Sequence, residues 1–267
     1  MIEFANPAAY ECWMGRWSTR LAPAMVAFAD LPGGARLLDV GSGTGALAHA
    51  LVESVADATV VGIEPAAEFV ARCRETNTDP RLRFETGDAL AIPFPDASFD
   101  ATLSLLILQE LPDVPLALSE MRRVTRPSGP VVASQWDFAD GMPMLSLFWD
   151  AVLEVAPGAA SREAAARCME VAYPDGAALE RLWRETGLVE VATERHDIDM
   201  TFASFDDYWR PFLSNVSAAS SFAGTLGDDQ RSALERRLRR TATGAAPGGP
   251  FTLKAHAWAV RGRVPAR

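Results

Sequence analysis

The segment that decides the fold of this chain is Ala35-Arg36-Leu37-Leu38-Asp39-Val40-Gly41-Ser42-Gly43-Thr44-Gly45. An apolar run leads into a glycine-rich turn, and residues 46–55 after it have a helix-like composition. This order predicts a strand, a tight turn and the start of a helix. Glycine permits positive φ and leaves no side chain between the main chain and a ligand. The unpaired N–H groups of the following helix favour a nucleotide-like cofactor in the crevice.

Strand-like and helix-like segments alternate around this turn, from residue 35 to residue 137. The expected strands are 35–40, 58–63, 81–86, 99–106 and 130–136, and the expected helices are 45–56, 65–76 and 114–126. Uninterrupted apolar strands are typical of a parallel sheet that is covered on both faces. The alternation therefore predicts a doubly wound α/β fold.

Polar and glycine residues fall at or near the carboxyl ends of these strands, where such sheets bind ligands. They are Gly41, Glu64, Asp88 and the segment 104–106. Glu64 lies about twenty residues after the glycine turn, where an acid can accept hydrogen bonds from ribose hydroxyls. The spacing Gly41-x-Gly43-x-x-Ala46 also fits the dinucleotide fingerprint. Since NAD and S-adenosylmethionine (SAM) both carry this ribose, these residues leave the cofactor open.

Four motifs, which follow one another along the chain, narrow the choice of cofactor. They are Leu38 to Gly45, Gly87-Asp88-Ala89, Ile92 to Asp100 and Glu120 to Gly129. Together they resemble class I SAM-dependent methyltransferases over roughly residues 35–137, most of all the small-molecule, quinone-methyltransferase-like branch. The resemblance implies SAM as cofactor and S-adenosylhomocysteine (SAH) as product. It also implies a Rossmann-like, seven-stranded, mostly parallel sheet whose last strand inserts antiparallel beside the sixth.

The resemblance also implies a set of cofactor-binding residues. The backbone around the glycines would pack on the methionine part and the ribose, and Glu64 would take the ribose hydroxyls. Asp88 would accept from the adenine amine, although Gly-Asp is also a common turn pair. Asp39 is expected to support the turn from a buried position with a hydrogen-bond partner. The full expected set is Gly41, Ser42, Gly43, Gly45, Glu64, Pro65, Asp88, Ala89 and Leu105, with Ile63, Pro65 and Leu90 around the adenine ring.

No catalytic residue is assigned from the sequence. Gln109 stands where the family often carries histidine, and an amide cannot act as a base near neutral pH. Asp137 and Glu110 are candidate bases, and Tyr10 could orient the acceptor. Because the methyl group of SAM is already electrophilic, a base is needed only if the acceptor must lose a proton. Positioning and the exclusion of water can supply much of the rate.

The segments outside the motifs are expected to cover the substrate side. Residues 1–34 would form an N-terminal helical lid, or else an amphipathic helix docked on the core, and Arg16 there could meet a carboxylate of cofactor or substrate. Aromatic and methionine residues at 136–149 and 205–212 would line an apolar pocket or fill the core of the added helices. Further helices are expected at 161–171, 175–186 and 228–243, and strands at 189–202 and 251–261. The expected parts are 1–34, the SAM-binding core 35–139, a helical insertion 140–172, a core helix and strand 173–202, a helical lid insertion 203–250, and the last strand and tail 251–267.

Composition narrows the function further. The chain has 267 residues and a net charge of −10, which argues against a nucleic-acid substrate. Its three cysteines have neither metal nor disulfide spacing, and its start lacks the pattern of a signal peptide, so a cytoplasmic location is expected. No apolar run approaches the length that spans a bilayer.

The predicted function is methyl transfer from SAM to a small, partly apolar acceptor such as a quinone, a lipid or a secondary metabolite. Methylation of oxygen, nitrogen or carbon is left open. The alternatives are a SAM-binding module without catalysis, a nicotinamide-dependent oxidoreductase and a nucleic-acid methyltransferase.

Overall fold

The computed structural model describes residues 6–244 and 248–266. Three parts of the expected organisation therefore lie partly outside the described residues. They are the beginning of the N-terminal segment (1–5), the middle of the turn-rich connector (245–247) and the last residue of the tail (267).

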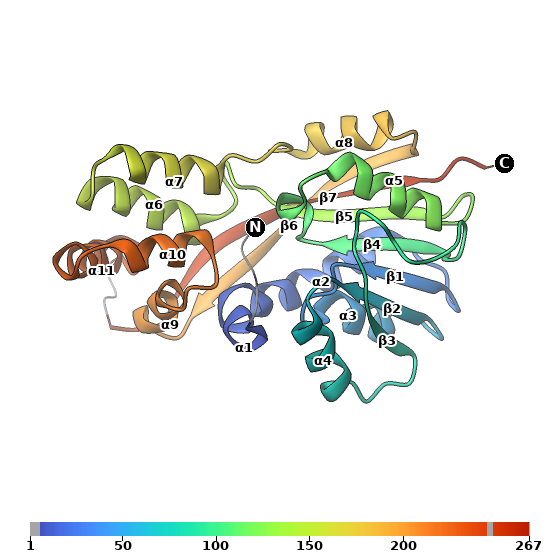
Figure 1. The fold of residues 1–267 in the computed structure, drawn as a ribbon, viewed down its shortest axis with the longest axis horizontal. Helices are drawn as coiled ribbons and strands as arrows, with labels where there is room; N and C mark the ends of the chain where they lie inside the picture. Colours follow the sequence, from blue (N-terminus) through green and yellow to red (C-terminus); the bar gives the residue numbers. More distant parts are fainter. Residues whose placement is uncertain (1–5, 245–247, 267) are drawn as a thin grey trace.

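A seven-stranded sheet in the order β3-β2-β1-β4-β5-β7-β6 forms the centre of the structure (Figure 1). Its strands are β1 (Arg36–Val40), β2 (Thr59–Glu64), β3 (Leu82–Thr86), β4 (Ala101–Leu105), β5 (Pro130–Trp136), β6 (Val189–Phe202) and β7 (Phe251–Arg263). Strands β1 to β5 pair in parallel. Strand β7 lies between β5 and β6 and is antiparallel to both. The predicted mostly parallel sheet with an inserted antiparallel last strand is confirmed.

Helices cover both faces of this sheet. Alternate strand residues face opposite ways, so that Leu37 belongs to the apolar layer under α2 and α3, whereas Leu38 belongs to the layer under α5 and α8. The described helical segments are α1 (Pro7–Tyr10), the π-helix η1 (Glu11–Gly15), α2 (Arg16–Ala29), α3 (Ala46–Ser54), α4 (Ala67–Thr76), the 3₁₀ turn η2 (Leu108–Glu110), α5 (Val114–Val124), α6 (Pro143–Val155), α7 (Ala159–Met169), α8 (Gly176–Glu185), α9 (Phe205–Trp209), the 3₁₀ turn η3 (Arg210–Leu213), α10 (Ala218–Thr225) and α11 (Asp228–Ala242).

The added helices gather at one end of the sheet. In Figure 1, α6, α7, α9, α10 and α11 lie around the end of β6 and the start of β7, on the side of the sheet opposite to the C-terminus. Buried aromatic rings hold this helical part together: Phe212 stacks on Phe148 at 4.4 Å between ring centroids and meets Trp13 edge-on at 5.0 Å. The contact with Trp13 joins the N-terminal segment to the added helices.

Several expected boundaries shift by one or two residues, and two departures from the expected elements concern the site. Strand β4 ends at Leu105, one residue early, because Leu106 turns into the left-handed region with φ +62°. The N-terminal segment is not one regular helix, since a π-helical turn separates α1 from α2. Both departures lie beside the cavity described below.

Candidate functional site

The glycine turn is tied to the neighbouring strand by its main chain. The N–H groups of Gly41 and Ser42 both donate to the Ile63 carbonyl, at 2.8 and 2.9 Å. Gly41 has φ +72°, and a Cβ there would lie 2.7 Å from the Ile107 side chain. Gly41 is therefore required by its conformation and by the space around it.

Glu64 closes the turn from the end of β2. Its Oε2 accepts from the Gly43 N–H at 3.1 Å, and its Oε1 accepts from the Ala66 N–H at 3.2 Å. Burial raises the pKa of Glu64 above its usual range, and these two N–H donors oppose the shift. The carboxylate thus holds the glycine turn in register with β2 and also lines the cavity.

The surroundings of Asp39 differ from those that the sequence predicts. It is 1% exposed, and neither carboxylate oxygen has a hydrogen-bond partner within the described chain. Burial raises the pKa of Asp39 to about 8, and the charge of Glu64 adds to the shift. The nearby Ala48 N–H opposes this rise in the pKa of Asp39, although the two groups do not have the geometry of a hydrogen bond. The expected hydrogen-bond partner of Asp39 is absent, and a small cavity of about 20 Å³ that includes Ser18 and Ser42 adjoins this acid.

Asp88 is both a turn residue and a cavity residue. Its Oδ1 accepts from the Leu90 N–H at 2.9 Å, which forms a local turn, and the residue lines the large cavity. Both readings of Asp88 from the sequence are thus compatible with its position.

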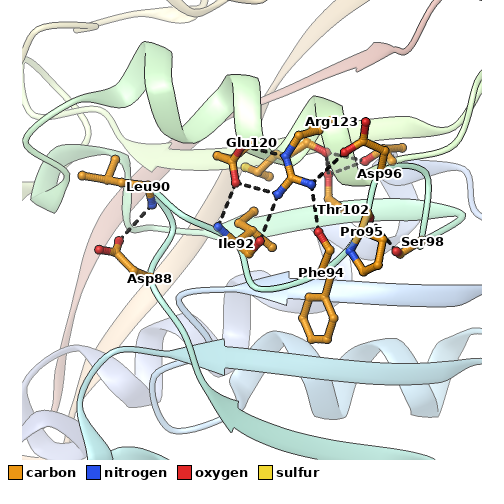
Figure 2. A network of polar contacts seen from close by, with 12 residues as sticks. Asp88, Leu90, Ile92, Phe94, Pro95, Asp96, Ser98, Thr102, Glu120 and Arg123 are labelled. Atoms are coloured by element: carbon orange, nitrogen blue, oxygen red, sulfur yellow. Dashed lines mark hydrogen bonds and ion pairs between the residues drawn. The ribbon is translucent and has the colours of Figure 1, made fainter.

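The loop after Asp88 is held by Arg123 of α5 (Figure 2). The guanidinium donates to the carbonyls of Ile92 (2.9 Å) and Phe94 (2.8 Å) and to the carboxylates of Asp96 (2.9 Å) and Glu120 (2.7 Å). Glu120 also accepts from the Ile92 N–H at 2.9 Å. The third and fourth motifs of the sequence, the loop at 92–100 and the segment from Glu120, therefore form one hydrogen-bonded unit.

One cavity of about 630 Å³ connects the ends of the strands with the added helices. This volume is within the range typical of small-molecule sites, about 300–1,000 Å³. Of the expected cofactor-binding set, six residues line it: Gly41, Gly43, Glu64, Pro65, Asp88 and Ala89. Ser42 and Leu105 line the small adjoining cavity beside Asp39.

Gly45 lines neither cavity. It begins α3 with φ +89°, and a Cβ there would lie 3.2 Å from Phe84 and 3.3 Å from His49. Its role in this structure is to let the chain enter α3 against β3. Ile63, expected beside the adenine ring, is fully buried and also lies outside both linings, whereas Leu90 lines the large cavity.

The apolar wall of the cavity comes from several separate parts of the chain. Aromatic and methionine residues expected from the sequence are among them: Tyr10, Trp13, Met14, Trp136, Phe138 and Met142. The segments 167–173 and 217–219 also contribute; the sequence predicted that the insertions around them cover the substrate side, but it did not single out these residues. They reach the cavity only through the packing of α7 and α10 against the rest of the helical part.

Two polar side chains turn out to be engaged elsewhere. The Arg16 guanidinium pairs with the Asp207 carboxylate at 2.8 Å, so its carboxylate partner comes from the protein itself. Asp137 is not among the residues that line the cavity, and it accepts from His256 (3.0 Å), Trp258 (3.1 Å) and the backbone N–H groups of residues 139 and 140. Although burial works against it, these hydrogen bonds hold the pKa of Asp137 below its usual range. The expectation that Asp137 is a candidate base is wrong.

Glu110, the other candidate base, does line the cavity, and so does Gln109. Burial raises the pKa of Glu110 above its usual range. Tyr10 lies over the glycine turn, 4.0 Å from the position of a Cβ on Gly43, and burial raises the pKa of its phenol to about 12. Its hydroxyl is therefore protonated near neutral pH.

A doubly wound sheet with a glycine turn and acids at successive strand ends defines a Rossmann-like α/β protein that binds an adenosyl-type cofactor. The family model for a methyltransferase domain matches residues 38–133. Within this α/β core, residues 38–133 thus match a methyltransferase domain, and the core is similar to those of class I SAM-dependent methyltransferases, whose cofactor is SAM.

Known proteins agree with this assignment. The chain is 32% identical over 145 residues to a fatty-acid O-methyltransferase of Mycolicibacterium smegmatis, covering 54% of this chain and 51% of the relative. It is 39% identical over 115 residues to a demethylmenaquinone methyltransferase of Deinococcus radiodurans, covering 42% of this chain and 47% of the relative. The chain thus spans about half the length of the curated relatives that it matches.

A solved structure extends the similarity of fold beyond the core. Phosphoethanolamine N-methyltransferase 2 of Haemonchus contortus, in complex with SAM, superposes with a TM-score of 0.58 and 16% identity over 98% of this chain and 57% of that one. At this identity the likeness concerns the fold alone.

Proposed function

We propose that this chain transfers the methyl group of SAM to a small, partly apolar acceptor. One observation carries the proposal: a single cavity joins Gly41, Glu64 and Asp88, at the strand ends, to the apolar wall around Trp136 and Met142. A cofactor and a second small molecule can therefore meet in one enclosed space. The names of the relatives, a fatty-acid and a demethylmenaquinone methyltransferase, fit an acceptor with an apolar body.

The residues present fit SAM part by part. Asp39 has two buried carboxylate oxygens without partners next to a small cavity at the glycine turn, which suits the cationic amino group of the methionine part. Glu64 lies where the ribose hydroxyls would replace or share its present backbone hydrogen bonds. Asp88 and the Ala89 N–H are placed for the adenine edge, with Pro65 and Leu90 beside the ring.

SAM supplies an electrophilic methyl group when it is bound; the protein positions the acceptor and excludes water. The outer segments serve this second task in our proposal. Residues 1–34 contribute Tyr10 and Trp13, residues 140–172 contribute Met142, and residues 203–250 contribute segment 217–219 to the cavity wall. Enclosure of this kind favours in-line displacement because it holds the two reactants at short range.

The test is a thermal-shift comparison of SAM, SAH and NAD at equal concentrations, followed by detection of SAH formed from SAM with a panel of apolar acceptors. A ligand that binds only the native state raises the unfolding midpoint. We expect a rise with SAM and SAH and none with NAD. Stabilisation by NAD alone would favour an oxidoreductase, and SAM binding without turnover on any acceptor would favour a non-catalytic binding module.

The remaining expectations are also part of this proposal. We infer a cytoplasmic location and no nucleic-acid substrate, supported by three free cysteines and the net charge of −10. Across residues 6–244 and 248–266, no helix combines the length and the apolar character needed to cross a bilayer.

A further inference from the structure

The polar side chains at the acceptor end of the cavity offer mainly hydrogen-bond acceptors. The Gln109 amide nitrogen donates to the Leu106 carbonyl at 2.6 Å, and its Oε1 is buried without a partner within the described chain. Gln135 is 2% exposed and likewise donates its amide nitrogen to a backbone carbonyl, that of Tyr173. A buried acceptor without a donor costs about 1–3 kcal/mol, so Gln109 Oε1 calls for a donor from a ligand.

Glu110 is next to Gln109 in the same 3₁₀ turn. Glu110 is exposed and lines the cavity, and no side chain of the described residues donates a hydrogen bond to it or forms an ion pair with it. Its charge acts on Tyr10 and Cys168, which line the same cavity from α1 and α7. Glu110 therefore lies near both the N-terminal segment and the helical part, on the wall of the cavity that they share.

The charged side chains of the cavity wall are mostly acidic. Among the described residues that line it, the carboxylates are Glu64, Asp88, Glu110 and Glu170, and the only basic side chain is Arg167; all of these except Glu64 are exposed. An anionic acceptor would meet net repulsion in this cavity, whereas a cation would be attracted. The wall around these groups is otherwise apolar.

From these contacts we propose that the acceptor is an amine carried on an apolar body, and that Glu110 binds its nitrogen, with Gln109 Oε1 as a second hydrogen-bond acceptor. This inference rests on the proposed function. Glu110 thereby serves as a catalytic residue next to Gln109, the position at which the resembling family often carries histidine. Gln109 also holds the carbonyl of Leu106, whose left-handed conformation starts this turn.

The reaction at this site balances without a further reactant. One proton passes from the ammonium nitrogen of the acceptor to a carboxylate oxygen of Glu110. The freed lone pair of the nitrogen forms the new N–CH₃ bond while the S–CH₃ bond breaks and its electron pair stays on sulfur. The positive charge that entered on the sulfonium leaves on the methylated nitrogen, and SAH leaves as a neutral thioether. Glu110 later returns its proton to solvent.

The test measures binding of three probes of equal chain length to the SAH-saturated protein: octylamine, octanol and octanoate. Calorimetry near pH 7 gives each affinity. We expect octylamine to bind at least about tenfold more tightly than octanol or octanoate, which corresponds to about 1.4 kcal/mol or more. We expect Glu110→Gln to remove most of this preference, Glu110→Asp to recover part of it, and Glu163→Gln, which removes the same charge from α7 outside the cavity, to keep it.

Three results would overturn the inference. They are octanol or octanoate binding as tightly as octylamine, an unchanged amine affinity in Glu110→Gln, and SAH binding without any amine binding. SAH affinity checks the fold of each variant, and if Glu110→Gln fails that check, the ranking of probes on the wild-type protein decides. If the wild-type protein does not bind SAH at all, the proposed function fails first, and the two failures are distinguished.

Discussion

At the residue scale, the carboxylate of Glu64 both stabilises the glycine turn and lines the cavity. It accepts hydrogen bonds from the N–H groups of Gly43 and Ala66, and it lines the cavity in which we propose that the ribose binds. Replacing Glu64 by alanine should weaken SAH binding by about 1–3 kcal/mol, since both the turn and the ribose lose an acceptor. Calorimetry with SAH checks this, with Glu68→Ala, an exposed acid in the first turn of α4, as the matched control. Equal affinity in both variants would mean that the ribose lies elsewhere.

Asp39, also at the residue scale, predicts how the stability of the protein depends on pH. Its pKa in the folded protein is about 8, against an ordinary value of 3.8, because it is buried without a partner. Between these values the native state holds a proton that the unfolded chain releases, so the free energy of unfolding falls as the pH rises. Glu64 contributes in the same direction. Asp39→Asn should therefore flatten the decrease in unfolding midpoint of the ligand-free protein between about pH 5 and pH 8. The same slope in both proteins would contradict the raised pKa assigned to Asp39 in the folded protein.

At the element scale, Arg123 links α5 to the loop that follows Asp88. Its guanidinium meets two carbonyls and two carboxylates, and its side chain is 32% exposed, so the interaction is partly screened by solvent. Arg123→Ala should lower the free energy of unfolding by about 1–3 kcal/mol through the lost charged hydrogen bonds. It should also weaken SAH binding, because the loop carries Asp88 and Leu90.

Urea unfolding and SAH calorimetry measure the two effects of Arg123→Ala. The control is Arg126→Ala, whose guanidinium pairs with Asp100 and is 50% exposed. It should change the unfolding free energy by less than about 1 kcal/mol. If Arg123→Ala loses stability but binds SAH as the wild type does, the loop does not shape the adenine site.

At the scale of the whole molecule, the sheet and the added helices share one apolar core. Phe212 is fully buried between Phe148, Tyr208 and Trp13, and so connects η3, α6, α9 and the N-terminal segment. Phe212→Ala should lower the free energy of unfolding by about 3–5 kcal/mol, because it leaves a cavity at this junction. Leu213→Ala, at the neighbouring residue that is 52% exposed, should have little effect.

Urea unfolding followed by fluorescence and by circular dichroism measures this prediction. Since one core joins both parts, the two probes should report the same transition. A separate, earlier transition of the helical part would show that it is not held by this cluster.

The hydrogen bonds of Arg123 and Glu120 show how much of the site could be predicted from the sequence and how much could not. The segments at 92–100 and 120–129 could each be recognised along the chain, and so could the strands and the glycine turn, because they follow local rules of periodicity and turn chemistry. That Glu120 and Arg123 bind the loop at 92–96 is a contact across about thirty residues, which only folding decides.

The sequence by itself determined the sheet, the order of its elements and the strand ends at which a ligand binds, since parallel strands with apolar runs must bring their carboxyl ends to one edge. Tertiary structure alone decided which polar groups face the cavity. Asp137 interacts with His256, and Arg16 pairs with Asp207. Gly45 packs close to Phe84, whereas Glu110 lines the cavity. The reason is physical: a side chain's role depends on which distant groups pack around it and satisfy it, and no local pattern encodes those neighbours.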